Sequence, residues 1–172
     1  KVIEETGYQP SSQAQMLRTK KTKLVGVILP KIDSNTISRE VAGISDILTK
    51  QGYQLILANT NNSTEEELKY LSLFRDNQVD GVIFIATILT KQHKDMLKEY
   101  RVPIVLLGQH LEGYPCIYQD DYKAAMSLTE ELVKSGKKFG YITVTDKDEA
   151  VGKKRLSGVE EVLKKNRIEL NS

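Results

Sequence analysis

Four short, nearly continuous apolar runs divide most of the chain into regular intervals. They read LVGVIL, YQLILA, GVIFIA and PIVLLG, at residues 24–29, 53–58, 81–86 and 103–108. Runs of this length that are rich in Val and Ile are typical of strands covered on both faces, as the strands of a parallel sheet are. We therefore predict four parallel strands.

The segments between these runs carry apolar residues at helical spacing. The stripes are Ile37, Val41, Ile44 and Leu48, then Leu68, Leu71 and Phe74, and then Met96, Leu97 and Tyr100. Thr64 with Glu67 forms a capping box, and Gly52 and Gly136 stand where a left-handed residue would end a helix. The alternation predicts an α/β fold with a doubly wound parallel sheet, in which ligands bind at the carboxyl ends of the strands.

After a short strand around Ile117 the pattern starts again. We predict a helix with Ala125, Leu128, Leu132 and Val133, a strand FGYITV at 139–144, and a helix with Leu156, Val159 and Leu163. This material begins a second sheet but is too little to close a lobe of its own. Because the chain also starts at Lys1 and not at Met, we expect a fragment of a longer two-lobed protein.

Composition narrows the setting. With 172 residues and 40% hydrophobic side chains the chain can bury a core, and no apolar run approaches the roughly eighteen residues of a membrane span. No signal segment opens the chain, and the single Cys116 cannot form an internal disulfide, so we expect a cytoplasmic protein. The net charge is only +2, but Arg18, Lys20, Lys21 and Lys23 concentrate positive charge near the start.

Signatures of catalysis, cofactor binding and metal binding are absent from the sequence, so we expect neither an enzyme nor a cofactor nor a metal. His93 and His110 have no partners at ligand spacing, and His93 is interpreted as a surface residue of a charged helix. Asp120 and Asp121 fit either the N-cap of the following helix or a pair of acid/base carboxylates. Cys116 is interpreted as a small buried hydrophobe.

Polar residues follow all four predicted strands. Candidate ligand-binding residues at these strand ends are Ser34, Thr36, Asn59, Asn61, Thr87 and Gln109. Taken singly, each is a residue type that loops and helix caps use anyway. Taken together, their amide and hydroxyl groups would suit a neutral ligand rich in hydroxyl groups.

The first residues of the chain carry a resemblance. GYQPSSQAQMLRTKKTKLVGVILP resembles the junction between the DNA-reading headpiece and the sugar-binding core in the lactose/galactose repressor family of bacterial transcription regulators. The matching residues are Gly7, Tyr8, Pro10, Ala14, Gln15 and Leu17, whereas Ser11 replaces the usual Asn. Further similar segments follow in order, namely VAGI (41–44), QGY (51–53), DNQVDGVI (76–83), VPIVLLG (102–108), QDDYKAA (119–125), SGKKFGYI (135–142) and KRLSGV (154–159).

Two kinds of departure concern the ligand more than the fold. Lys137 stands where the family usually has a His, and Lys31, Ser34 and Asn35 replace the usual Asp, Asn and Pro after the first strand. The segment PKIDSNTISREVAGI is most similar to the sucrose and trehalose operon branches of the family.

The resemblance implies a hinge helix within 10–17, with its leucine, Leu17, wedged into the minor groove of an operator. It places the DNA-binding hinge residues at Ala14, Gln15, Leu17 and Arg18, with a helix-turn-helix before Lys1. A solvated linker is the alternative for this basic segment. The family's R-x-x-G pattern matches Arg155 and Gly158 and implies that Arg155 grips the effector. The alternative is that Arg155 is one more charge beside its neighbouring lysines.

Together these observations predict three parts: the end of the headpiece with the hinge and linker at 1–23, an N-terminal lobe at 24–120, and the start of a C-terminal lobe at 121–172. The predicted function is that of a non-enzymatic repressor core which dimerises and couples a sugar or sugar-phosphate effector to operator DNA. A solute-binding receptor of periplasmic type and a doubly wound enzyme using Asp120 or Asp121 are the alternatives.

Overall fold

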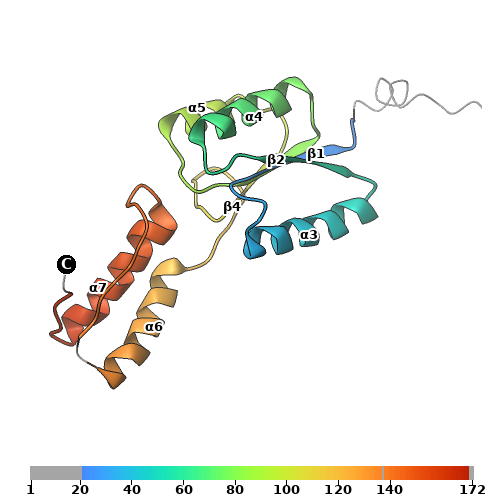
Figure 1. Ribbon diagram of the computed structural model, residues 1–172. Coiled ribbons are helices and arrows are strands. Elements are labelled where there is room, and N and C mark those ends of the chain that lie inside the picture. The colour runs from blue at the N-terminus through green and yellow to red at the C-terminus, as the bar shows by residue number, and fades with distance from the viewer. Residues whose placement is uncertain (1–20, 137, 171–172) are drawn as a thin grey trace, which may run out of the picture. The chain divides into compact units, whose positions relative to one another are not determined.

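The computed structural model describes residues 21–136 and 138–170, and the predicted hinge residues Ala14, Gln15, Leu17 and Arg18 lie outside this range. The strands are β1 (Leu24–Leu29), β2 (Gln54–Asn59), β3 (Gly81–Ile85), β4 (Ile104–Leu107) and β5 (Cys116–Ile117). They form one sheet in the order β2-β1-β3-β4-β5. β1 pairs in parallel with β2, from Leu24 opposite Gln54 to Leu29 opposite Asn59, and β4 pairs in parallel with β5. The predicted parallel α/β fold is confirmed (Figure 1).

Helices connect the strands as the apolar stripes predict. They are α3 (Asn35–Lys50), α4 (Thr64–Asp76), α5 (Lys91–Lys98), α6 (Asp121–Ser135) and α7 (Arg155–Lys165), with a π-helix η1 (Glu149–Lys154) leading into α7. By their contacts, the described residues fall into two compact units. One contains 21–83 and 96–104, and the other contains 84–95 and 105–170 without residue 137.

In the first unit, α3 and α4 lie on opposite faces of the β1–β2 pair (Figure 1). Val27, Ile28 and Leu29 of β1 are fully buried, and so is Leu71 of α4. Burial on both faces explains why β1 is apolar without alternation. The ring of Phe74 occupies the space that a Cβ at Gly26 would need, so glycine at this position permits the close packing of α4 on β1.

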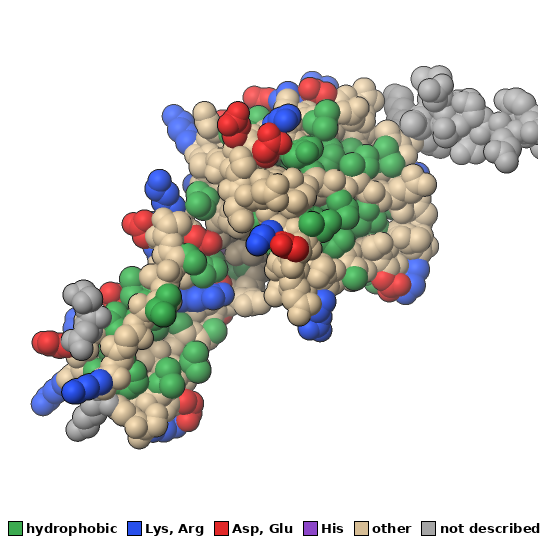
Figure 2. All heavy atoms as spheres, in the orientation of Figure 1, with side chains coloured by type: hydrophobic (Ala, Val, Ile, Leu, Met, Phe, Trp, Pro, Cys, Tyr) green, Lys and Arg blue, Asp and Glu red, His purple; other side chains and the backbone are tan. Residues whose placement is uncertain are grey.

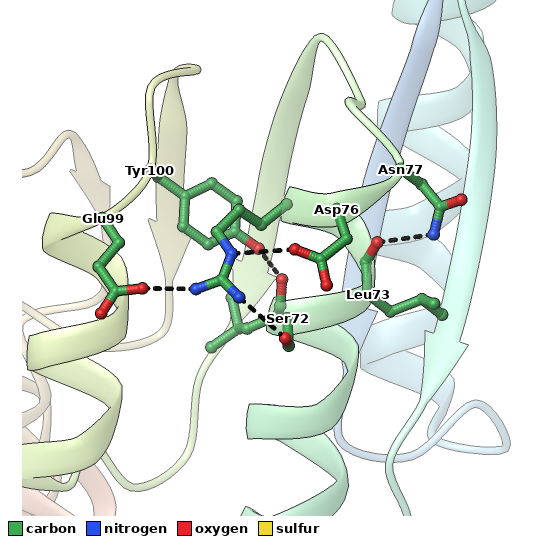
Figure 3. Close-up of polar contacts among 8 residues, drawn as sticks. Ser72, Leu73, Asp76, Asn77, Glu99 and Tyr100 are labelled. Carbon is green, nitrogen blue, oxygen red and sulfur yellow. Dashed lines mark hydrogen bonds and ion pairs between the residues drawn. The ribbon is translucent and has the colours of Figure 1, made fainter.

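A polar cluster ties the end of α4 to the residues that follow α5 (Figure 3). The Arg75 guanidinium donates from Nη1 to Glu99 Oε2 at 2.5 Å and from Nη2 to Ser72 Oγ at 3.1 Å. Its Nε donates to Asp76 Oδ1 at 3.2 Å. Beside it, the Tyr100 hydroxyl donates to the carbonyl oxygen of Leu71, and burial raises the pKa of Tyr100. These contacts fasten the segment that leads into β4.

In the second unit, α6 and α7 lie side by side (Figure 1). Gly158 of α7 faces the Tyr122 carbonyl and Ala125 of α6, so closely that a Cβ at this position would collide with the α6 backbone. Val162 and Leu163 of α7 are almost fully buried. The small residue at position 158 therefore sets the distance between the two helices.

The predicted strand at 139–144 is wrong. Residues 138–145 have no regular secondary structure, and the Ile142 side chain is 99% exposed. A strand needs a neighbour that completes its hydrogen bonds, and none of the strands within the described residues pairs with this segment. The apolar side chains of this segment are therefore not buried in a sheet.

Two of the predicted helix ends also differ. The N-cap of α4 is Ser63, whose Oγ accepts from the backbone N–H of Glu66 at 3.3 Å, and not Thr64. Gly52 has φ of +73° and follows α3 as predicted. Gly136, by contrast, follows α6 with φ of −169°, an extended conformation, so the left-handed assignment at this position is wrong.

His93 is not a surface residue, as the sequence suggested, because its side chain is fully buried. Its Nδ1 accepts from the backbone N–H of Thr90 at 3.2 Å, and its ring lies 5.7 Å from that of Phe84. His93 and Leu97 are one helical turn apart on α5, and both are buried. The buried face of this lysine-rich helix therefore includes the histidine.

Candidate functional site

The loops that follow β1 and β2 are tied together by Asn59. Its Oδ1 accepts from the backbone N–H of Ile32 at 3.1 Å, and its Nδ2 donates to Asn61 Oδ1 at 2.9 Å. Asn61 has φ of +51°, a conformation that asparagine adopts more readily than most residues. The backbone N–H of Thr60 also donates to the Leu29 carbonyl at 3.0 Å. The structure thus brings the two loops together, as the parallel strands predict.

Ser34 and Thr36 lie at the start of α3 in the same unit. Ser34 is the N-cap of α3 by position, but its side chain makes no capping hydrogen bond. Thr36 is exposed in the first turn of the helix. The hydroxyl group of Ser34 is therefore not used to close the helix.

In the second unit, Thr87 and Gln109 meet at the ends of β3 and β4. Gln109 is only 6% exposed, and its Nε2 donates to the Thr87 carbonyl at 2.7 Å and to Asp148 Oδ1 at 2.9 Å. Both amide hydrogens are thereby used, which leaves Oε1 as the acceptor that could meet a ligand hydroxyl.

Asp148 is the polar residue that the sequence reasoning missed. Its Oδ1 also accepts from the backbone N–H groups of Ala150 and Val151, at 3.1 and 3.0 Å, and so caps η1. An aspartate directly before a helical segment is a recognisable N-cap signal. The link from Asp148 to Gln109 is a long-range contact that no local signal indicates.

Arg155 is committed to an ion pair. Its Nε donates to Asp121 Oδ1 at 2.6 Å, and the side chain of Asp121 is 7% exposed whereas that of Arg155 is 44% exposed. A carboxylate this deeply buried needs a cationic partner, because removing water from an unpaired charge is costly. Arg155 therefore connects the start of α7 with the first turn of α6, through one nitrogen of its guanidinium fork.

A cavity of about 330 Å³ opens beside this ion pair. Asp121 and Arg155 are among its polar lining residues, and Leu128, Leu132 and Val159 are among its apolar ones. Hydrophobic side chains also reach the surface over the α6–α7 pair (Figure 2), where Leu128 is 64% and Leu132 46% exposed.

The neighbouring Asp120 has a different role from Asp121. Its Oδ1 accepts from the backbone N–H of Lys123 at 3.1 Å and caps α6, which confirms the N-cap interpretation. The hydrogen bond from the Lys123 side chain and then that from its backbone N–H lower the pKa of Asp120. Asp120 thus caps α6, whereas its neighbour Asp121 forms the ion pair with Arg155.

The candidate residues fall into two sets. Ser34, Thr36, Asn59 and Asn61 belong to the first unit, whereas Thr87, Gln109 and Arg155 belong to the second. Within the described residues, no group of histidine, cysteine and acidic side chains could hold a metal ion. A search of those residues for a helix long and apolar enough to cross a membrane also finds none.

Comparisons with known proteins find relatives among bacterial sugar-responsive regulators. The sucrose operon repressor of Staphylococcus xylosus is 32% identical over 159 residues, which are 92% of this chain and 50% of that protein. Catabolite control protein A of Staphylococcus aureus is 32% identical over 171 residues, 98% of this chain and 52% of that protein. The chain therefore spans about half the length of these relatives.

Among solved structures, the transcription regulator CcpA of Lactococcus lactis superimposes with a TM-score of 0.78 at 36% identity, over 87% of this chain and 56% of that one. A family described as periplasmic binding proteins and sugar-binding domain of the LacI family matches residues 22–171. The chain belongs to this family, and its parallel sheet and helices are those of a LacI-type effector domain.

Proposed function

We propose that this chain forms the effector-binding core of a sugar-responsive transcriptional repressor that acts on operator DNA in the cytoplasm. The observation that carries the proposal is the similarity to the sucrose operon repressor of Staphylococcus xylosus over 92% of the chain. The core performs no catalysis in this scheme. Its two ligands are a small sugar or sugar phosphate and, through residues near its start, DNA.

The proposed organisation keeps the boundaries expected from the sequence: headpiece end, hinge and linker at 1–23, the N-terminal lobe at 24–120, and the start of the C-terminal lobe at 121–172. The hinge residues Ala14, Gln15, Leu17 and Arg18 would contact the operator. Two copies would dimerise and place their hinges side by side on DNA. Effector and operator are then coupled reciprocally, because each favours one of the same two states.

For the effector we propose contacts with Ser34, Thr36, Asn59, Asn61, Thr87, Gln109 and Arg155. The hydroxyl groups of Ser34 and Thr36 and the Oε1 of Gln109 suit a ligand that both donates and accepts hydrogen bonds. The guanidinium of Arg155 adds a rigid pair of donors for vicinal hydroxyl groups or an anionic group.

The test uses the protein expressed from its complete coding sequence. Calorimetric titration with sucrose, trehalose, their 6-phosphates and fructose phosphates should find one ligand that binds, and that ligand should shift operator affinity at fixed salt concentration. DNA fragments from the promoter regions nearest the coding sequence serve as operators, with scrambled fragments as controls. Sugar turnover, or operator binding that no sugar alters, would contradict the proposal.

A further inference from the structure

One carboxylate holds the two residues through which the chain enters the core. Asp80, in the turn before β3, accepts at Oδ1 from the backbone N–H of Thr22 at 2.8 Å and from its Oγ1 at 2.9 Å. Its Oδ2 accepts from the backbone N–H of Lys23 at 3.0 Å. Two consecutive N–H groups thus point at one anion, an arrangement in which successive backbone N–H groups form an anion-binding concavity.

The backbone at this point is bent into an uncommon conformation. Lys23 has φ of +58°, which few residues other than glycine adopt without support from their surroundings. Its carbonyl accepts from the N–H of Gln54 at 2.8 Å, and its Nζ lies 4.3 Å from the centre of the Tyr53 ring. The N–H of Asp80 donates back to the Leu24 carbonyl at 2.8 Å. Residues 22–24 are therefore fixed from several sides.

We infer that Asp80 is a positioning residue for DNA binding: its carboxylate clasps Thr22 and Lys23 and so fixes the direction in which the basic segment before them leaves the core. This inference rests on the proposed function, in which that segment reaches the operator. If the start of the basic segment is held in one direction, the segment loses less conformational freedom when it binds DNA than a segment that can pivot. Asp80 should therefore affect operator affinity without touching DNA.

The direction of the pKa shift of Asp80 agrees with an ionised carboxylate that accepts hydrogen bonds from Thr22 and Lys23. Partial burial acts to raise the pKa, but the hydrogen bonds from the backbone and side chain of Thr22, and then from the N–H of Lys23, lower it below its usual value. The carboxylate is thus charged at neutral pH and accepts hydrogen bonds at both oxygens.

The first test asks whether the clasp exists in solution, and it uses the 172-residue chain itself. In Asp80→Ala, amide hydrogen exchange at Thr22 and Lys23 should accelerate about tenfold or more, while exchange at Val27 in β1 stays as in the parent. Alanine is preferable to asparagine here, because an asparagine before Gly81 would deamidate. Asp46→Ala is the matched control, since it removes an exposed carboxylate that pairs, among the described residues, with Lys50 on the same helix. Unchanged exchange at Thr22 and Lys23 would overturn the inference.

The second test measures function in the protein expressed from its complete coding sequence. Asp80→Ala should weaken operator binding about tenfold at fixed salt concentration while effector affinity and the unfolding midpoint change little. Thr22→Val should act in the same direction, and Thr22→Ser, which keeps the hydroxyl, should not. Thr22→Val also keeps the test decisive if Asp80→Ala does not fold.

The outcomes separate this inference from the proposed function. If the parent binds operator and the variants bind it equally well, the positioning role is wrong and the proposed function stands. If operator affinity, effector affinity and stability fall together, Asp80 is a structural residue only and the inference is again wrong. If the parent binds no operator, the proposed function fails and the role in DNA binding fails with it, whatever hydrogen exchange shows.

Discussion

At the scale of single residues, two buried polar side chains link segments that are distant in the sequence. Gln109 joins the Thr87 carbonyl to Asp148, and Asp121 receives Arg155. A buried polar group without a partner would destabilise the fold, so each such contact holds two segments in a defined relation. The candidate binding residues are therefore partly structural.

Tyr100 offers a measurable case. Tyr100→Phe removes the hydroxyl that donates to the Leu71 carbonyl and should lower the free energy of unfolding by about 1 kcal/mol. Tyr70→Phe on α4 is the control, because within the described residues the Tyr70 hydroxyl has no hydrogen bond. Urea unfolding of both variants checks the prediction, and equal stability would contradict it.

The same residue predicts a dependence on alkaline pH. Burial raises the pKa of Tyr100 above the ordinary value of 10.0, so the folded state keeps its phenol proton where the unfolded state loses it. This contribution to stability is complete below about pH 10 and is lost as the pH rises further. The free energy of unfolding of the parent should fall more steeply above pH 10 than that of Tyr100→Phe. Parallel curves for the two proteins would show that Tyr100 does not titrate as inferred.

Arg155 requires a test that separates its two roles. Arg155→Ala leaves the buried Asp121 without its partner, so lost stability could be mistaken for lost binding. Arg155→Lys keeps a cation near Asp121 but loses the planar fork. In the complete protein it should weaken effector binding about tenfold to a hundredfold while the unfolding midpoint changes less than in Arg155→Ala.

Calorimetry and thermal unfolding check this prediction. Lys153→Ala is the control, since Lys153 pairs with Glu149 on its own helical segment, and it should leave effector affinity unchanged. If Arg155→Lys binds the effector as tightly as the parent, the ion pair with Asp121 is the whole role of Arg155.

Local signals predict some single-residue roles correctly, although Ser63 and not Thr64 caps α4 and Gly136 is extended. Asp120 caps α6 as its position predicts, because an N-cap is defined by the residues next to it. The burial of His93 and the contact between Gln109 and Asp148 depend on partners that are distant in sequence. Which loop residues face a ligand also depends on contacts between residues that are distant in the sequence.

At the scale of elements, continuous apolar runs predicted β1 to β4 to within one residue at each end. Both faces of β1 are buried, as such a run indicates, whereas Ile56 and Leu57 of β2 are exposed. The run at 139–144, which includes Tyr141 and Thr143, forms no strand. It also has no neighbour: β1 has β2 and β3 beside it, whereas none of the described strands lies beside 139–144.

The α6–α7 pair should be sensitive to one added methyl group. Gly158→Ala places a Cβ against the Tyr122 carbonyl and Ala125, and should lower the free energy of unfolding by about 1–3 kcal/mol. Gly43→Ala in α3 is the matched control, because nothing lies within 4 Å of the added Cβ and alanine favours helix; it should raise stability by up to about 1 kcal/mol. Denaturant unfolding of both variants provides the measurement, and a neutral Gly158→Ala would mean that the two helices can move apart freely.

At the scale of the whole molecule, the apolar surface of the second unit matters most. Leu128 and Leu132 of α6 are 64% and 46% exposed, and Ile142 and Val144 are 99% and 51% exposed. Large apolar side chains exposed to this extent favour a place where another segment or molecule binds. Since the chain spans about half the length of its relatives, the remaining half of such a protein is the candidate for covering it.

We therefore predict that this surface is covered in the protein expressed from its complete coding sequence. In a Cys116→Ser background, a thiol introduced by Leu132→Cys should react with a maleimide about tenfold or more slowly in the complete protein than in the 172-residue chain, because a covered thiol must wait for local opening. Glu130→Cys is the control: it lies on the same helix but on the opposite side from Leu132, and its thiol should react at similar rates in both proteins. Comparing the two thiols separates the burial of one face of α6 from a general difference in thiol reactivity between the two proteins. If Leu132→Cys reacts equally fast in both proteins, the apolar face of α6 stays open in the complete protein, and its exposed leucines would have to be explained by a partner molecule.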